Sequence, residues 1–78
     1  MYVRAAAAQI TIMTGDQGDR YEGQTQRWQK HGHGVFTNAS GERYEGEWRD
    51  DLANGQGTMT HPNGRVESGQ WEDSNFLG

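Results

Sequence analysis

Residues 41–60, GERYEGEWRDDLANGQGTMT, decide the fold of this 78-residue chain. In the first half, Tyr44, Gly46 and Trp48 alternate with charged residues, so an extended strand would have one aromatic face and one solvated face. Residues 55–60 alternate in the same way. The stretch therefore predicts a β-hairpin whose strands are joined by a loop of at most six residues, 49–54.

The glycines in this hairpin need a physical reason, because glycine weakens a strand. Their phase on the strand face favours a packing role over a role in turns alone. We expect a large ring on one strand to lie flat over a glycine on the next strand, a close approach that the missing side chain permits. Tyr44 and Trp48 would then alternate with glycines across the sheet.

The hairpin recurs with a step of 23 residues. Tyr21 becomes Tyr44, and Trp48 becomes Trp71. One of the glycine series in the same phase is Gly23, Gly46 and Gly69. A fixed period in this range indicates a stack of supersecondary units, none of which has a core of its own. Turn sequences separate the units, and the strongest of them covers residues 62–64, Pro-Asn-Gly.

These observations predict an all-β protein of one domain, a single-layer antiparallel meander of repeated β-hairpins. The repeats cover residues 16–38 and 39–61, with a partial repeat over 62–78. Residues 1–15 predict a degenerate N-terminal hairpin or cap, because residues 12–14 lie in phase with later strands. We expect a strand over residues 9–14. Residues 1–8 stay open between a strand and a short helix, since the alanines favour helix.

The repeat resembles the MORN repeat (membrane occupation and recognition nexus). The family pattern is a Tyr-Glu-Gly-Glu-Trp strand, a short loop, His-Gly-x-Gly, an aromatic residue and a closing glycine turn. Residues 44–48 and 54–59 carry this pattern in the second repeat. Three positions depart from it: Thr25 replaces Trp, Glu67 replaces Tyr and Asn54 replaces His. The resemblance implies a ribbon of hairpins that serves scaffolds or membrane surfaces.

Composition excludes several classes of function. Cysteine is absent, so no disulfide or thiolate metal site can form. The net charge is −4, and the seven basic residues are scattered among acids. We therefore expect no nucleic-acid binding, and binding to an anionic membrane is disfavoured. No signal peptide or transmembrane segment is apparent, so we expect an intracellular protein, cytoplasmic or cytoskeleton-associated.

Signatures of catalysis are missing from the sequence. It contains no nucleophile elbow, phosphate loop or metal signature, so we expect neither enzyme activity nor a cofactor. His31 and His33 are two residues apart, hence on one strand face, and could in principle hold a metal. No third ligand stands in an obvious place, so we expect no metal site. His61 precedes a proline in a turn, where we expect it to be exposed to solvent.

The candidate binding residues lie on the aromatic face and in one loop. They are Tyr21, Trp28, Phe36, Tyr44, Trp48 and Trp71. The rings of the face can stack only on one another and on glycines, or can also contact a partner. Trp28, in the loop, is either folded back to replace the ring missing at Thr25, or an anchor for a partner.

The sequence thus predicts a non-catalytic module for protein–protein interaction or scaffolding, which docks onto a larger cytoskeletal or membrane-associated assembly. The physical reason is that a single-layer sheet leaves an aromatic face and two edges available. Self-association through the sheet edges is a further expectation, and association with a phospholipid surface is the alternative function. We also expect the chain to be stable only when docked or paired with another copy.

Overall fold

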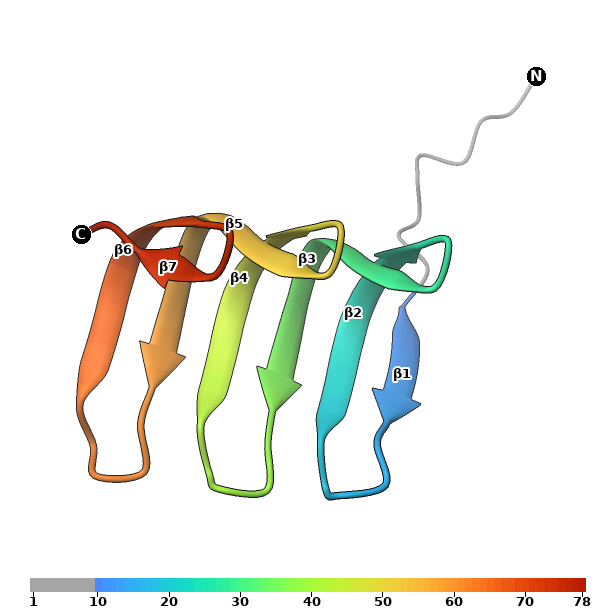
Figure 1. Ribbon diagram of the computed structural model, residues 1–78, viewed down its shortest axis with the longest axis horizontal. Coiled ribbons are helices and arrows are strands. Elements are labelled where there is room, and N and C mark those ends of the chain that lie inside the picture. The colour runs from blue at the N-terminus through green and yellow to red at the C-terminus, as the bar shows by residue number, and fades with distance from the viewer. Residues whose placement is uncertain (1–9) are drawn as a thin grey trace.

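A computed structural model describes residues 10–78, which form one sheet of seven antiparallel strands (Figure 1). The strands are β1 (Thr11–Thr14), β2 (Arg20–Gln26), β3 (Gln29–Thr37), β4 (Arg43–Arg49), β5 (Leu52–Thr60), β6 (Val66–Glu72) and β7 (Asn75–Phe76). Each strand pairs with the next one along the chain, so the sheet is an uninterrupted meander. The predicted all-β, single-layer fold is confirmed. In this described part, no helix is long and apolar enough to cross a bilayer.

Tight turns of two residues join the strands of each repeat along one edge of the ribbon (Figure 1). The turn residues are Arg27 and Trp28, Asp50 and Asp51, and Asp73 and Ser74, all with φ between 50° and 72°. Positive φ at both positions matches the right-handed twist of the flanking strands. The expected loop over residues 49–54 is therefore shorter than its upper limit, because Arg49 and Leu52 already pair.

Longer turns at the opposite edge connect one repeat to the next. Each contains a glycine with φ between 91° and 95°, namely Gly18, Gly41 and Gly64. The N–H of Gly41 donates to the carbonyl of Asn38 over 3.0 Å, and that of Gly64 to the carbonyl of His61 over 2.9 Å. These turns fall where the Gly-containing turn sequences predict them.

Rings of the aromatic face lie over glycines, as predicted. A Cβ atom added to Gly34 would overlap the ring of Tyr21, and one added to Gly57 would overlap the ring of Tyr44. The Tyr21 hydroxyl donates to the Gln24 carbonyl over 2.6 Å. This arrangement repeats from one hairpin to the next. Gly34 and Gly57 each leave the space that one tyrosine ring occupies.

The aromatic face is folded upon itself rather than left open. The register shifts between Gly46 and Trp48, opposite Gly55, whose φ is 100°. Such bulges bend a strand, and Figure 1 shows the hairpin ends with the tight turns curling over the sheet. As a result, the core consists of Tyr21, Tyr44, Trp48, Ala53 and Trp71, with Met13, Phe36 and Met59 packed against it.

The N-terminal strand is observed as β1, Thr11–Thr14, so the prediction of a strand here is confirmed for residues 11–14. Met13 pairs with Tyr21 and packs against the core, so the face continues onto β1 with a methionine in place of a ring. The alternative between strand and helix for residues 1–8 lies outside the described residues.

Candidate interaction surface

Four of the six predicted binding residues form the core of the ribbon. Tyr21, Tyr44, Trp48 and Trp71 are each no more than 8% exposed. Phe36 is half-buried beside them. These rings therefore stabilise the fold. Any contact that they make with a partner is limited to the small area that they expose.

The buried rings form a chain of edge-to-face contacts along the ribbon. Tyr44 meets Trp48 at 4.9 Å and Trp71 at 5.3 Å between centroids, with interplanar angles of 81° and 82°. Tyr21 meets Trp48 at 5.7 Å and 89°. Edge-to-face pairs of this kind stabilise by about 0.5–1.5 kcal/mol beyond their buried area.

Hydrogen bonds fix the orientation of these rings. The indole N–H of Trp48 donates to the Gly34 carbonyl over 3.1 Å, and that of Trp71 to the Gly57 carbonyl over 3.0 Å. Burial raises the pKa of Tyr21 to about 12, and the carboxylate of Asp51 adds to the shift. The tyrosine hydroxyl consequently stays a neutral donor throughout the physiological range.

Trp28 lies outside this stack, at the tip of the β2–β3 turn. Its side chain is 80% exposed, so it does not fold back toward Thr25. At the position where the family pattern has tryptophan, the Thr25 hydroxyl pairs instead with that of Thr11 over 3.1 Å. The interpretation that Trp28 folds back is therefore wrong, and its role as an anchor for a partner stays a prediction.

Lys30 is a residue whose position the sequence did not indicate. Its ammonium lies over the rings of Tyr21, Phe36 and Trp48, at 5.8, 5.4 and 5.3 Å from their centroids. The Asp51 carboxylate lies 3.5 Å from the same ammonium. Cation–π contacts with a partly buried ammonium stabilise by about 0.5–2 kcal/mol. We call this lysine-filled site of Tyr21, Lys30, Phe36, Trp48 and Asp51 the first cage.

The backbone of the first cage is repeated 23 residues further along the chain, where Ala53 and Ser74 take the places of Lys30 and Asp51. Asp51 receives the N–H of Lys30 on its carboxylate over 2.7 Å and donates its own N–H to the Lys30 carbonyl over 2.9 Å. Ser74 does the same with Ala53, over 3.1 and 2.9 Å. Each tight turn is thus fastened onto the previous hairpin, and Ala53 occupies the place of Lys30.

We call the equivalent site in the next repeat, built around Ala53, the second cage. Because alanine replaces lysine there, the site holds a pocket of about 260 Å³. Its lining consists of Phe36, Tyr44, Trp48, Ala53, Met59 and Trp71, with Lys30, Asp51 and Ser74 as the polar members. The equivalents of Tyr21, Phe36 and Trp48 are Tyr44, Met59 and Trp71. A mostly apolar concavity with a few polar groups is the usual form of a binding site.

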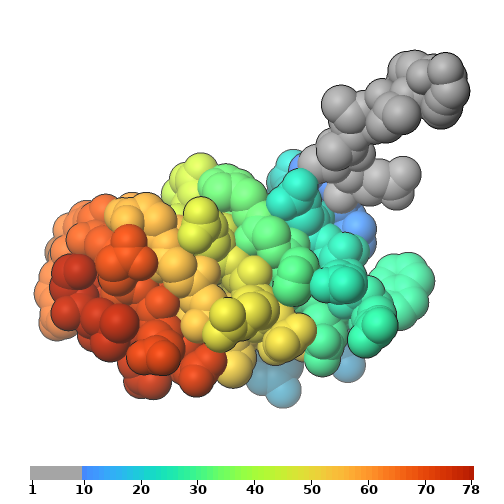
Figure 2. Space-filling view, turned by 90° about the horizontal axis from the view of Figure 1, so that it is seen from above, coloured from blue at the N-terminus to red at the C-terminus, as the bar shows by residue number. Residues whose placement is uncertain are grey.

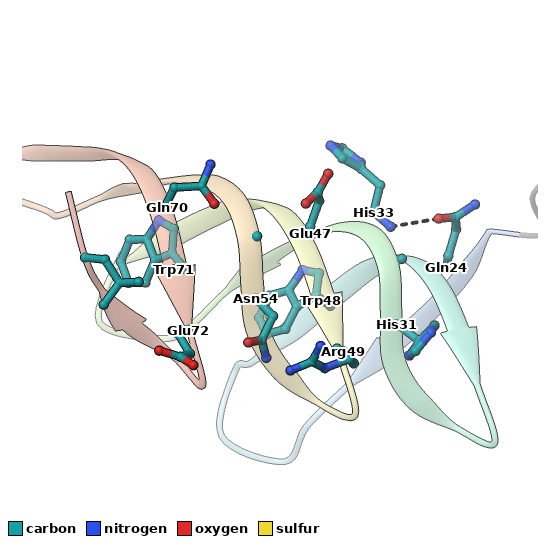
Figure 3. A pocket seen from close by; sticks show the side chains of 13 residues that line it. Gln24, His31, His33, Glu47, Trp48, Arg49, Asn54, Gln70, Trp71 and Glu72 are labelled. Atoms are coloured by element: carbon teal, nitrogen blue, oxygen red, sulfur yellow. Dashed lines mark hydrogen bonds between the residues drawn. The ribbon is translucent and has the colours of Figure 1, made fainter.

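The outer surface of the bent hairpins carries a wider, shallow hollow of about 820 Å³ (Figure 3). Polar side chains line most of it, and some already serve the backbone. The side-chain amide oxygen of Gln24 accepts the backbone N–H of His33 over 2.7 Å, and the Glu47 carboxylate accepts that of Gln56 over 3.0 Å. This hollow is therefore less suited than the second cage to bury a partner's side chain.

The two histidines of this surface do not share a face, which contradicts the expected alternation. Figure 3 shows His31 and His33 pointing in different directions, and Gly32 between them has a φ of 82°. The strand is bulged at that glycine, so the period of two is broken. Across residues 10–78 no group of three His, Cys, Asp or Glu side chains is placed to hold a metal.

His61 belongs to an ionic cluster that joins two of the longer turns. Its Nδ1 lies 3.2 Å from a Glu42 oxygen, and its Nε2 lies 2.9 Å from a Glu67 oxygen. The hydrogen bond to Glu67 raises the pKa of His61, and the bond to Glu42 adds to the shift. Glu67 stands where the repeat has tyrosine, so a polar contact replaces the ring here.

The fold and the buried rings define a class: a ribbon of repeated β-hairpins whose aromatic residues recur at the same positions from one repeat to the next. The MORN repeat pattern matches residues 21–43 and 44–64, each match beginning at the tyrosine that covers a glycine. The chain belongs to the MORN-repeat family, as its resemblance predicts. A search of the curated proteins found no match to this chain.

Proposed function

We propose that this chain is a non-catalytic module that binds protein partners through its bent aromatic face. The observation that carries the proposal is the open second cage. Its walls are held rigid by buried rings and backbone hydrogen bonds, so a partner's side chain enters a preformed site. A preformed site costs little ordering free energy on binding.

The site chemistry supports binding over catalysis. Two acidic side chains on the outer face pair with arginines: Glu22 with Arg20 at 2.9 Å and Glu45 with Arg43 at 3.1 Å. The same pairs neutralise two of the cations that an anionic lipid surface would need. Binding of phospholipid remains the second candidate because of the family's general association with membranes, and the charge distribution disfavours it.

The test fills the second cage with the side chains of the first. The double substitution Ala53→Lys, Ser74→Asp copies the Lys30–Asp51 pair into the second hairpin and closes the pocket. We expect protein partners cross-linked to the wild-type chain in native extract to be lost from this variant. Quantitative mass spectrometry of both cross-linked samples measures the loss.

The matched control alters the outer face, with His33→Ala and Glu45→Ala, and should retain the partners. Retention of every partner by the filled variant would place binding elsewhere on the chain. Binding to anionic vesicles that weakens with added salt would support the phospholipid candidate instead.

A further inference from the structure

Trp28 is the most exposed large apolar side chain among the described residues, and it stands beside the question of what fills the open second cage. Trp28 is 80% exposed on a two-residue turn with φ values of 55° and 65°. Figure 2 shows the β2–β3 turn projecting beyond the neighbouring surface. Tryptophan is among the residues most often found as the central anchor of protein interfaces. An indole exposed in this way is suited to insertion into a matching pocket.

The second cage has neutral residues at the two positions that carry charge in the first cage. Ala53 replaces the ammonium of Lys30, and Ser74 replaces the carboxylate of Asp51. The Lys30 ammonium and the Asp51 carboxylate line the same pocket but lie 3.5 Å from each other, so neither is left to pair with a charged guest. A neutral side chain consequently fits the second cage better than a lysine does.

The shape and walls of the cage suit an aromatic occupant. A cavity of about 150 Å³ lined by apolar side chains holds a benzene molecule, and the second cage, at about 260 Å³, has room for the larger indole. Tyr44 and Trp71 line the pocket with the small part of each ring that is exposed, and Met59 offers a thioether that adapts to a ring. The Ser74 hydroxyl and the Asp51 carboxylate can accept an indole N–H at the mouth.

We propose that two copies of this chain associate, each inserting the indole of Trp28 into the second cage of the other. Trp28, Asp51 and Ser74 are equivalent residues of successive tight turns, so the anchor and the mouth of the pocket share one edge of the ribbon (Figure 1). A reciprocal exchange about a two-fold axis closes into a dimer. The inference rests on the proposed function only in using the same face.

Charge gives this dimer a distinctive salt dependence. Each copy has a net charge of −4, and the contact itself is apolar. Added salt screens the repulsion between the copies, so association should strengthen as ionic strength rises. An interface carried by ion pairs would weaken under the same conditions.

The experiment measures molecular mass against concentration by analytical ultracentrifugation. We expect a monomer–dimer equilibrium for the wild-type chain, and a dissociation constant raised about 100-fold by Trp28→Ala. The filled variant Ala53→Lys, Ser74→Asp should weaken the dimer as strongly. Val66→Ala removes another exposed apolar side chain and should leave the equilibrium unchanged.

Mixing the two defective variants separates this contact from any other. The Trp28→Ala chain keeps its pocket and the filled chain keeps its anchor, so one of the two contacts can form in the mixture. We expect the mixture to associate more tightly than either variant alone, and no such gain would overturn the proposal. A wild-type chain that stays monomeric, or a dimer insensitive to Trp28→Ala, would overturn it too.

These outcomes are independent of the proposed function. The mass measurement uses only purified chain, whereas the proposed function requires other proteins to be captured. A monomeric chain that still captures partners through the second cage would leave the proposed function intact.

Discussion

The two cages of this ribbon share a backbone and differ in their contents. The same pair of turn-to-hairpin hydrogen bonds fastens Asp51 to Lys30 and Ser74 to Ala53. The first cage is filled by the chain's own lysine, and the second is open. Lys30 fills the first cage, whereas no side chain of the described residues fills the second. The second cage is therefore the better candidate for binding.

The third hairpin extends the comparison. Phe76 stands where Lys30 and Ala53 stand and lies 5.0 Å from Trp71 between centroids. The same position of the repeat is thus a lysine that fills the first cage, an alanine beside the open pocket and a phenylalanine that packs on Trp71.

The largest expected effect comes from replacing a glycine on which a cage wall rests. Gly57→Ala forces a Cβ into the ring of Tyr44, which forms a wall of the second cage. We expect a loss of about 3 kcal/mol in the free energy of unfolding, because neither the ring nor the paired backbone can move away easily. Urea unfolding measures it.

Gly34→Ala is the equivalent change under Tyr21 in the first cage and should cost about as much. A cost below about 0.5 kcal/mol for both, typical of a surface substitution, would contradict the ring-over-glycine packing.

Emptying the first cage should have the next largest effect. Lys30→Ala removes the cation–π contacts and the aliphatic packing, at an expected cost of about 1–2 kcal/mol. Lys30→Met retains most of the packing and should cost less than half of that. If Lys30→Ala left stability unchanged, the lysine would be a surface residue and the contrast between the cages would fail.

The ionic cluster at His61 should make stability depend on pH. The folded-state pKa of His61 is raised above its ordinary 6.5, so its contribution is complete below that pH and is lost as pH rises through the raised pKa. The pKa values of Glu42 and Glu67 are lowered from 4.5, so their contribution is lost only as pH falls through those lowered values. The cluster is therefore most stabilising between pH 4.5 and 6.5.

Thermal unfolding of wild type and His61→Gln across this range tests the cluster. The difference in Tm should be largest between the two ordinary pKa values and should shrink as pH rises further. His33→Gln changes an exposed imidazole and serves as the control. A constant difference at every pH would show that the imidazole acts through packing and not through charge.

The smallest effect is expected on the outer face. Arg43 pairs with Glu45 at 3.1 Å, and both side chains are about half exposed, at 50% and 46%. Arg43→Ala should change the unfolding free energy by no more than about 0.5 kcal/mol. A loss above about 1 kcal/mol would mean that the outer face contributes to the fold as the cages do.

The meander could be predicted because its determinants are local and periodic. Alternation at Tyr44, Gly46 and Trp48 specifies the strand face, and the 23-residue step repeats it. The ring-over-glycine packing followed from the same phase. What periodicity could not show was the bend, since it depends on bulges at Gly32 and Gly55 that break the alternation.

The cages were missed because they join residues of different repeats. Lys30 meets Trp48 and Asp51 across the bend, and its sequence position alone suggests only a solvated lysine. The usable signal was the substitution of Lys30 by Ala53 one period later. The expected solvent exposure of His61 was wrong for the same reason, since Glu42 reaches it from the preceding long turn and Glu67 from strand β6.

The most direct test of the open second cage is a titration of the Trp28→Ala chain with free indole, followed by NMR. We expect saturable shifts of the Trp71 indole N–H and of the Ala53 and Ser74 amides. The filled variant Ala53→Lys, Ser74→Asp, with Trp28→Ala added, should show no saturable shift of the Trp71 indole N–H. Equal shifts in both proteins, or shifts confined to the outer face, would contradict the account.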